Sequence, residues 1–290
     1  MSKVAVMADS NSGITQSEAK ELGVYVLPMP FTIDGKSYLE DINLSQEEFY
    51  QFLMNDVDVA TSQPAIGDVK AFYDKILEDY DEIVHIPMSS GLSGTCQTAM
   101  MIAQEEPYKG KVHVVDSRRI SVIEKHDALS AVELVKQGKS AQEIVDLLTK
   151  TRSDCTIYIT VDTLHYLEKG GRLTPSAAAM GKLLKIKPIL TIQGDKLDSF
   201  KKTRTLAKGK EIMLESAIND INERIDPEGK GDNCEIYVAY SYNSKLGDEF
   251  VDEIKKVFPD HNITSNPLSL SICIHTGPNA IAIAVAKKIV

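Results

Sequence analysis

Apolar runs of strand length alternate with segments of helical spacing through the first half of the chain. The strand-like runs cover residues 3–8, 82–88 and 112–115, and the helix-like segments cover 66–80, 96–104, 121–137 and 140–150. Strands that alternate with helices predict a parallel sheet with helices on both faces. We therefore expect a first α/β domain over residues 1–154.

A turn signal interrupts this alternation early in the chain. Asp34-Gly35 lies between the strand-like runs 24–31 and 36–39, which predicts a hairpin inserted near residues 24–40. Ser45-Gln46-Glu47-Glu48 follows as a capping box and predicts a short helix through Met54.

From residue 155 onwards the pattern changes. Strand-like runs cover 155–160, 187–193, 196–205, 235–240 and 262–266, and helix-like segments cover 163–169, 206–224, 245–257 and 280–286. Gly194-Asp195 separates two of these strands and predicts a second hairpin, hence some antiparallel pairing. We expect an α+β domain over residues 155–290, with a ligand in the cleft between the two domains.

Composition and charge narrow the classes of partner. The chain has 290 residues, of which 43% are hydrophobic, and a net charge of −10. This charge argues against a nucleic acid or an anionic membrane as the main partner, but it does not exclude a local basic patch. No apolar run is long enough to span a bilayer and the start lacks a signal-peptide core, so we expect a cytoplasmic protein.

Cysteines and histidines give little support to a metal site. The four cysteines form no C-x-x-C pair and the six histidines are scattered along the chain. We expect the cysteines to be small buried side chains, as is usual in a reducing compartment.

The segment Ser89–Thr95 carries the strongest chemical signal. It follows the strand-like run 82–88, opens the helix-like segment 96–104, and holds four hydroxyls and two glycines. Glycines let a ligand approach the backbone, and the amides at a helix start favour an anion. A helix cap needs one hydroxyl, whereas this segment offers four. The pattern therefore predicts a site for a carboxylate or a phosphate.

Other candidates stand further along the chain. Thr61-Ser62-Gln63-Pro64 is a second hydroxyl cluster, which gains weight if it faces Ser93. Arg172, after a glycine turn, and Arg204, on the outgoing strand of the second hairpin, have the planar fork that suits a phosphate or a carboxylate. His275 precedes the helix-like segment 280–286, and we expect it beside the free amides of that helix.

Three common enzyme signatures are absent from the sequence or incomplete in it. The phosphate loop and the dinucleotide-binding fingerprint are both absent. The hydrolase elbow G-x-S-x-G is broken, because Thr95 stands where its last glycine belongs. Ser93, Asp116 and His275 still follow the chain order of such a hydrolase, so a serine hydrolase using Ser93 and His275 remains the alternative function.

Taken together, the motifs resemble the DegV family of bacterial fatty-acid-binding (FakB-type) proteins, over nearly the whole chain. The matching segments are Asp9-Ser10, Thr61–Pro64, Ser89–Thr95, Asp116-Ser117, Leu167–Leu173, Ile186–Leu190 and His275–Pro278. The resemblance implies an N-terminal Rossmann-like domain, a C-terminal α+β domain and one long-chain fatty acid, such as palmitate, stearate or oleate, between them.

The resemblance also implies roles for individual residues. The carboxyl end of the fatty acid would be held by Thr61 and Ser93, with Ser62, Gly94 and Thr95 beside them. His275, Arg172 and Arg204 would lie near the exposed end, the two arginines contacting the phosphorylated product or a partner. A separate ATP-dependent fatty acid kinase would phosphorylate the bound carboxylate for phospholipid synthesis. The protein itself would be a carrier without catalytic activity, metal or cofactor, and with at most transient membrane contact.

This chain departs from the usual family pattern at three positions. Ala65 stands where a serine is common, Cys96 where an aromatic residue is common, and Asn279 where a glycine is common. The proposed head-group residues are unaffected, but Ala65 and Cys96 lie next to them. We therefore expect the differences to bear on acyl-chain preference.

Overall fold

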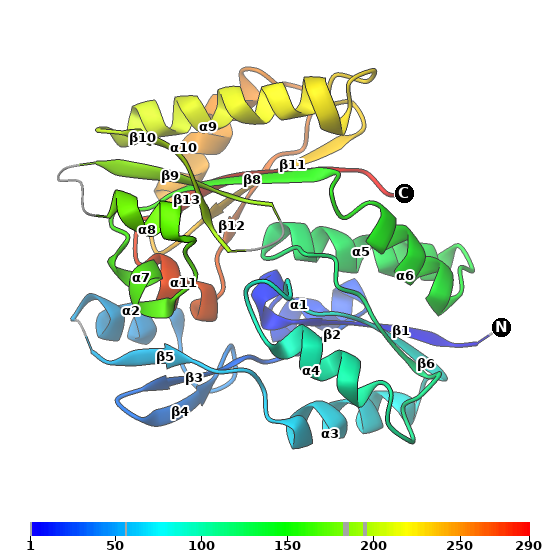
Figure 1. The fold of residues 1–290 in the computed structure, drawn as a ribbon. Coiled ribbons are helices and arrows are strands. Elements are labelled where there is room, and N and C mark those ends of the chain that lie inside the picture. Colours follow the sequence, from blue (N-terminus) through cyan, green and yellow to red (C-terminus); the bar gives the residue numbers. More distant parts are fainter. Residues whose placement is uncertain (1, 56, 182–185, 194–195) are drawn as a thin grey trace.

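The protein is described by a computed structural model covering residues 2–55, 57–181, 186–193 and 196–290. Two sheets are stacked with helices around and between them, and a small third sheet lies beside the first (Figure 1). All strands of the first sheet precede residue 155, and all strands of the second begin at that residue or after it. The division into domains at residues 154 and 155 stays a prediction.

The first sheet is parallel, as the alternation of strands and helices predicted. Its strands lie in the order β2 (Val24–Leu27), β1 (Val4–Asp9), β6 (Glu82–Ile86) and β7 (Val112–Val114). One face packs on α1 (Gln16–Leu22), α5 (Val122–Lys136) and α6 (Ala141–Lys150), and the other on α3 (Ile66–Leu77) and α4 (Thr95–Ile102). Both faces are therefore buried, which explains why most residues of these strands are apolar.

The central strand β1 shows how the sequence divides between these two faces. Val4, Val6 and Ala8 belong to the core beneath α5, whereas Ala5 and Met7 belong to the core beneath α3. Successive side chains of a strand point to opposite faces, so a continuous apolar run fills two cores at once.

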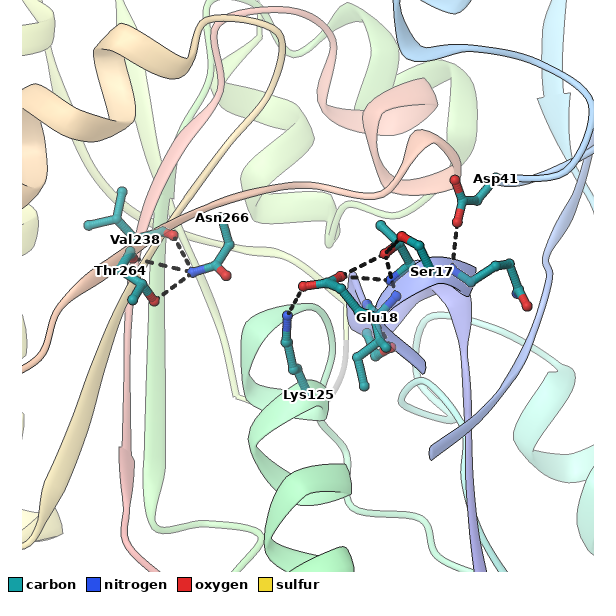
Figure 2. A network of polar contacts seen from close by, with 11 residues as sticks. Ser17, Glu18, Asp41, Lys125, Val238, Thr264 and Asn266 are labelled. Carbon is teal, nitrogen blue, oxygen red and sulfur yellow. Dashed lines mark hydrogen bonds and ion pairs between the residues drawn. The ribbon is translucent and has the colours of Figure 1, made fainter. Parts of the chain in front are cut away.

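In the part of the chain that the structure describes, capping boxes start three helices. Those at Ser45 and Ser140 are confirmed, with Ser45 opening α2 (Gln46–Met54). The third, at Thr15, opens α1, a seven-residue helix that the sequence analysis did not predict. Glu18 of this box also forms an ion pair with Lys125 of α5, with 3.3 Å between Oε1 and Nζ. Figure 2 shows this contact. The start of α1 is thus tied to the helix that lies between the two sheets.

The first hairpin is confirmed, but within a sheet of its own. β3 (Pro30–Ile33) and β4 (Lys36–Leu39) pair antiparallel, and Asp34 and Gly35 both have positive φ in the turn. β5 (Val59–Thr61), not predicted, pairs with β3 on its other side. The predicted strand 24–31 is therefore two strands, because the chain leaves the parallel sheet after Leu27.

The second sheet is mixed, as expected for an α+β arrangement. Its order is β10 (Asp198–Thr203), β9 (Lys187–Ile192), β8 (Cys155–Thr160), β13 (Ile281–Lys287), β11 (Cys234–Tyr240) and β12 (Thr264–Pro267). β9 and β10 pair antiparallel, as the second hairpin requires, while the turn at 194–195 lies outside the described residues. α9 (Leu206–Asp220), a π-helical turn (Ile221–Ile225) and α10 (Ser244–Lys255) cover the outer face.

The predicted helix over 280–286 is wrong. Residues Ile281–Lys287 form β13, the strand between β8 and β11. The run alternates a β-branched residue with an alanine, which is the two-residue period of a strand. Its apolar content alone favours a helix, and only this two-residue period distinguishes it as a strand.

Three short helices lie near the inner face of the second sheet. They are α7 (His165–Gly170), which was predicted, and α8 (Pro175–Met180) and α11 (Leu270–Thr276), which were not. His275 lies in the last turn of α11. The expectation that it stands beside the free amides at a helix start is therefore wrong.

Glu40 is a buried carboxylate that joins three distant parts of the chain. The hydroxyls of Ser10 and Ser271 each donate to its Oε2 at 2.8 Å, and the amide of Leu270 donates to Oε1. These bonds link the loop after β1, the end of the hairpin and the start of α11. Burial nevertheless raises the pKa of Glu40 to about 7.

We predict a measurable pH dependence from this group. Because the pKa of Glu40 is higher in the folded chain than its ordinary value, the stabilisation from proton uptake is present at low pH and lost as pH rises through about 7. Between pH 6 and pH 8 the free energy of unfolding should fall by about 1 kcal/mol on this account. Urea unfolding of the natural protein and of Glu40→Gln at both pH values measures it. Equal pH slopes for the two proteins would contradict the prediction.

Candidate functional site

A cavity of about 280 Å³ lies between the two large sheets; we call it the central cavity. The parallel sheet and its loops contribute Asn11 and Met88, and the second sheet contributes Ile157 and Ala282. Apolar side chains form most of its wall. This is the cleft between the two halves of the chain in which the sequence analysis expected a ligand.

The alternation along β13 makes room for this cavity. Ile281, Ile283 and Val285 fill the core beneath α9 and α10. Ala282 and Ala284 point the other way and line the central cavity, as does Ala239 of the neighbouring strand β11. Methyl groups on the inner face leave space that larger side chains would fill.

Polar side chains gather at one place on the cavity wall. Thr61, at the end of β5, has its Oγ1 3.0 Å from Nε2 of His275 on α11. Ser62, Gln63, Ser93 and Gly94 also line the cavity here. The two hydroxyl clusters predicted from the sequence thus border one cavity. This proximity strengthens the case that Thr61 and Ser62 belong to the ligand site.

The hydroxyls of Ser90 and Ser93 in the Ser89–Thr95 turn make different contacts. Ser90 donates to Asp116 at 2.7 Å, which fastens the turn to the loop after β7. Ser93 Oγ accepts from the Thr95 amide at 3.2 Å and lies 2.9 Å from Thr95 Oγ1. Thr95 is buried at the first position of α4, whereas Ser93 borders the cavity.

Arg172 brings a positive charge to the same place. Its Nε donates to the carbonyl of Leu92 at 3.3 Å and its Nη1 to the carbonyl of Gly170. Among the residues that the structure describes, no carboxylate forms an ion pair with it. An anion held by the polar cluster would therefore meet a guanidinium whose charge is not already neutralised.

A second, smaller cavity of about 170 Å³ adjoins this cluster; we call it the outer cavity. Thr61, Arg172 and His275 line both cavities. His165 and Lys169 of α7 line the outer one, with Lys169 paired to Asp58 at 2.9 Å. The polar cluster is thus the junction between a largely apolar space and a less apolar one.

His275 is uncharged at neutral pH. Burial, reinforced by the nearby Arg172, lowers the pKa of His275 to about 4. Its ring can therefore exchange a hydrogen bond with Thr61 or a ligand without bringing a charge.

The structure does not assemble the hydrolase arrangement. His275 Nε2 lies against Thr61, Ser93 lies against Thr95, and Asp116 holds Ser90. Within the described part of the chain, no hydrogen bond joins any two of Ser93, Asp116 and His275. A nucleophilic serine requires its base within hydrogen-bond reach.

Arg204 is a candidate residue that lines neither of the two cavities. It is exposed just after β10. Its role as a partner contact stays a prediction.

The chain is similar to known proteins both in sequence and in structure. A family model described as uncharacterised protein, DegV family, matches residues 3–288. The chain belongs to the DegV family. A DegV domain-containing protein of Staphylococcus aureus (strain N315) is 34% identical over 99% of this chain and 100% of its own length.

Two solved DegV structures share the fold at 27% identity and a TM-score of 0.87. One, a DegV family protein from Thermus thermophilus described by its fatty acid binding, covers 98% of this chain and 99% of its own. The other, described as DegV, a fatty acid binding protein from Bacillus subtilis, covers 99% of this chain and 100% of its own. The α/β architecture with a parallel and a mixed sheet is thus that of the family.

Some cavity-lining residues of this DegV protein were not predicted from the sequence. Ser121 and Ser271 line the central cavity although neither was a candidate. The wall alanines Ala282 and Ala284 were missed as well, and here a signal existed in the alternation of β13. Metal ligation gains no support, since no group of three or more potential ligands occurs among the described residues.

Gly170 offers a test of the Thr61–His275 contact. A Cβ at this position would lie 2.0 Å from Nδ1 of His275, so Gly170→Ala must displace the imidazole. We expect the bond to Thr61 to be lost, with a destabilisation of about 1–3 kcal/mol. The His275 ring signals in NMR spectra report the displacement.

Gly171→Ala is the matched control. Nothing lies within 4 Å of a Cβ at Gly171, although its φ of +68° is unfavourable for alanine. This variant should lose about 1 kcal/mol through backbone strain and leave the His275 signals in place. Unchanged His275 signals in Gly170→Ala would show that the ring position is not fixed as described.

Proposed function

We propose that this protein is a carrier that binds one long-chain fatty acid in the central cavity, with its carboxyl group at Thr61, Ser93 and His275. Ser62, Gly94 and Thr95 would shape the same end of the site. The observation that carries the proposal is the largely apolar cavity whose polar end adjoins the outer cavity at Thr61, Arg172 and His275. Fatty acid binding by the two DegV relatives supports it.

The energetics suit an acyl ligand. Burial of a methylene gains about 0.8 kcal/mol, so a palmitoyl chain gains roughly 10 kcal/mol before the entropic cost of binding. Affinity therefore depends little on the head group, which the hydroxyls of Thr61 and Ser93 and the neutral His275 can hold by hydrogen bonds. The polar cluster would mainly fix which end of the ligand faces outward.

The outer cavity gives the carboxyl group an approach from outside. In the proposed function a separate fatty acid kinase phosphorylates the bound carboxylate with ATP, and the acyl phosphate enters phospholipid synthesis. Arg172, which lines both cavities without an ion pair in the described structure, is placed to meet a phosphoryl group. Arg204 would contact the partner. The protein would act in the cytoplasm, touch membranes transiently and catalyse no step itself.

No helix among the described residues is long and apolar enough to cross a membrane.

Extraction of the purified protein with organic solvent, followed by mass spectrometry, tests the proposal. We expect about one fatty acid per chain, or stoichiometric uptake of added palmitate or oleate after delipidation. Absence of both bound lipid and uptake would overturn the carrier function. Chain length and unsaturation of the extracted lipid would define the preference.

A further inference from the structure

A third cavity, of about 210 Å³, is lined by four arginines; we call it the arginine pocket. Arg118 and Arg119 come from the loop between β7 and α5, Arg152 follows α6, and Arg224 lies in the π-helical turn after α9. Segments far apart in the sequence thus bring four guanidinium groups to one concave site.

Two of these arginines already have anionic partners. Arg119 is buried and paired with Asp127, and its Nη2 donates to the carbonyl of Thr151 at 2.6 Å. Arg224 lies 3.6 Å from Asp220 and donates to the carbonyl of Cys155 at 3.0 Å. These pairs hold the two side chains in fixed positions on the pocket wall.

The other two arginines are not neutralised. Neither Arg118 nor Arg152 forms an ion pair with any residue that the structure describes, and no Asp or Glu lies among the described residues of the pocket wall. Arg118 has a φ of +57°, a backbone conformation that non-glycine residues rarely adopt. This positive concentration stands out in a chain whose net charge is −10.

We propose that the arginine pocket binds an oxyanion of the phosphate class. Arg118 and Arg152 supply paired N–H donors that match phosphate oxygens, and an anion relieves their mutual repulsion with Arg119 and Arg224. The cavity has room for such an anion and bound water, since one water takes about 30 Å³.

The arginine pocket is separate from the head-group site. It shares Ile157 and Ile192 with the central cavity, but neither Thr61, Arg172 nor His275 lines it. The proposal therefore does not depend on fatty acid binding.

Phosphate can come from a free phosphate compound or from a lipid head group, and two assays separate these sources. Isothermal titration with inorganic pyrophosphate tests the first. Co-sedimentation with vesicles of phosphatidylcholine containing about one third phosphatidylglycerol tests the second, with pure phosphatidylcholine as the reference. The variant is Arg118→Ala/Arg152→Ala.

The control Lys136→Ala/Lys150→Ala removes the same charge from the ends of α5 and α6, outside the pocket. We expect the arginine variant to bind at least about tenfold more weakly in one of the two assays, and the control to stay within about twofold of the natural protein. The assay that responds identifies the source. If the arginine variant and the control behave alike in both assays, or the natural protein binds in neither, the proposal is wrong. Matching melting temperatures would show that both variants are folded.

Discussion

Ala284→Phe is expected to weaken palmitate binding about a hundredfold while the protein stays folded. Ala284 lines the central cavity from β13, so a phenylalanine ring there occupies space that the acyl chain would fill. The ring displaces about four methylenes, which is worth roughly 3 kcal/mol of binding free energy. A shorter ligand such as laurate should lose less, so the preference should shift towards short chains. Titration of the delipidated protein with both acids measures the effect.

Ala286 on the same strand provides the control. Both alanines are buried and point to the same face, but Ala286, unlike Ala284, does not line the cavity. Ala286→Leu should therefore destabilise the protein by about 1–3 kcal/mol through overpacking, whereas Ala284→Leu should not. If Ala284→Phe and Ala284→Leu were both folded and bound palmitate as the natural protein does, the ligand would not lie along β13.

Arg172→Ala is expected to separate binding from phosphorylation. Fatty acid affinity should change less than about threefold, because the buried acyl chain supplies most of the binding free energy. Phosphorylation of the bound acid by a fatty acid kinase and ATP should slow by about a hundredfold or more, since a donor to the developing charge is lost. Direct titration gives the affinity, and transfer of labelled phosphate gives the rate.

Arg172→Lys sharpens this test. It keeps the charge at the junction of the two cavities but cannot donate in pairs, so an intermediate rate is expected. If Arg172→Ala abolished fatty acid binding itself, the carboxylate rather than the phosphoryl group would be the partner of Arg172. Arg204→Ala should leave fatty acid binding unchanged, because Arg204 lines neither cavity.

Local signals predicted the parallel sheet and the hairpin at Asp34-Gly35. These features depend on residues close together in the sequence, such as the apolar run at 82–88 and the positive φ at Gly35. β13 was assigned wrongly because its length and apolar content suited a helix, although its β-branched residues alternate with alanines as in a strand. Its pairing with β8 and β11, which local composition does not show, gives it the extended form.

Local sequence patterns likewise predicted some residues of the site and not others. Ser93 and Thr61 could be singled out because glycine and hydroxyl residues cluster around them. Ser271, by contrast, lines the cavity because of where the chain returns: its Oγ lies 2.7 Å from Oδ1 of Asn11, 260 positions earlier in the sequence. Such contacts depend on tertiary packing, and no local pattern marks them.

The position of β13 has a consequence for the order in which the protein can fold. This strand lies between β8 and β11, yet it follows both in the sequence. During synthesis the earlier strands emerge first, and their inward edges remain unpaired until β13 is inserted. We therefore expect the parallel sheet to form ahead of the mixed one in the nascent chain. Because Ala282 and Ala284 of β13 line the central cavity, lipid capture would await that insertion.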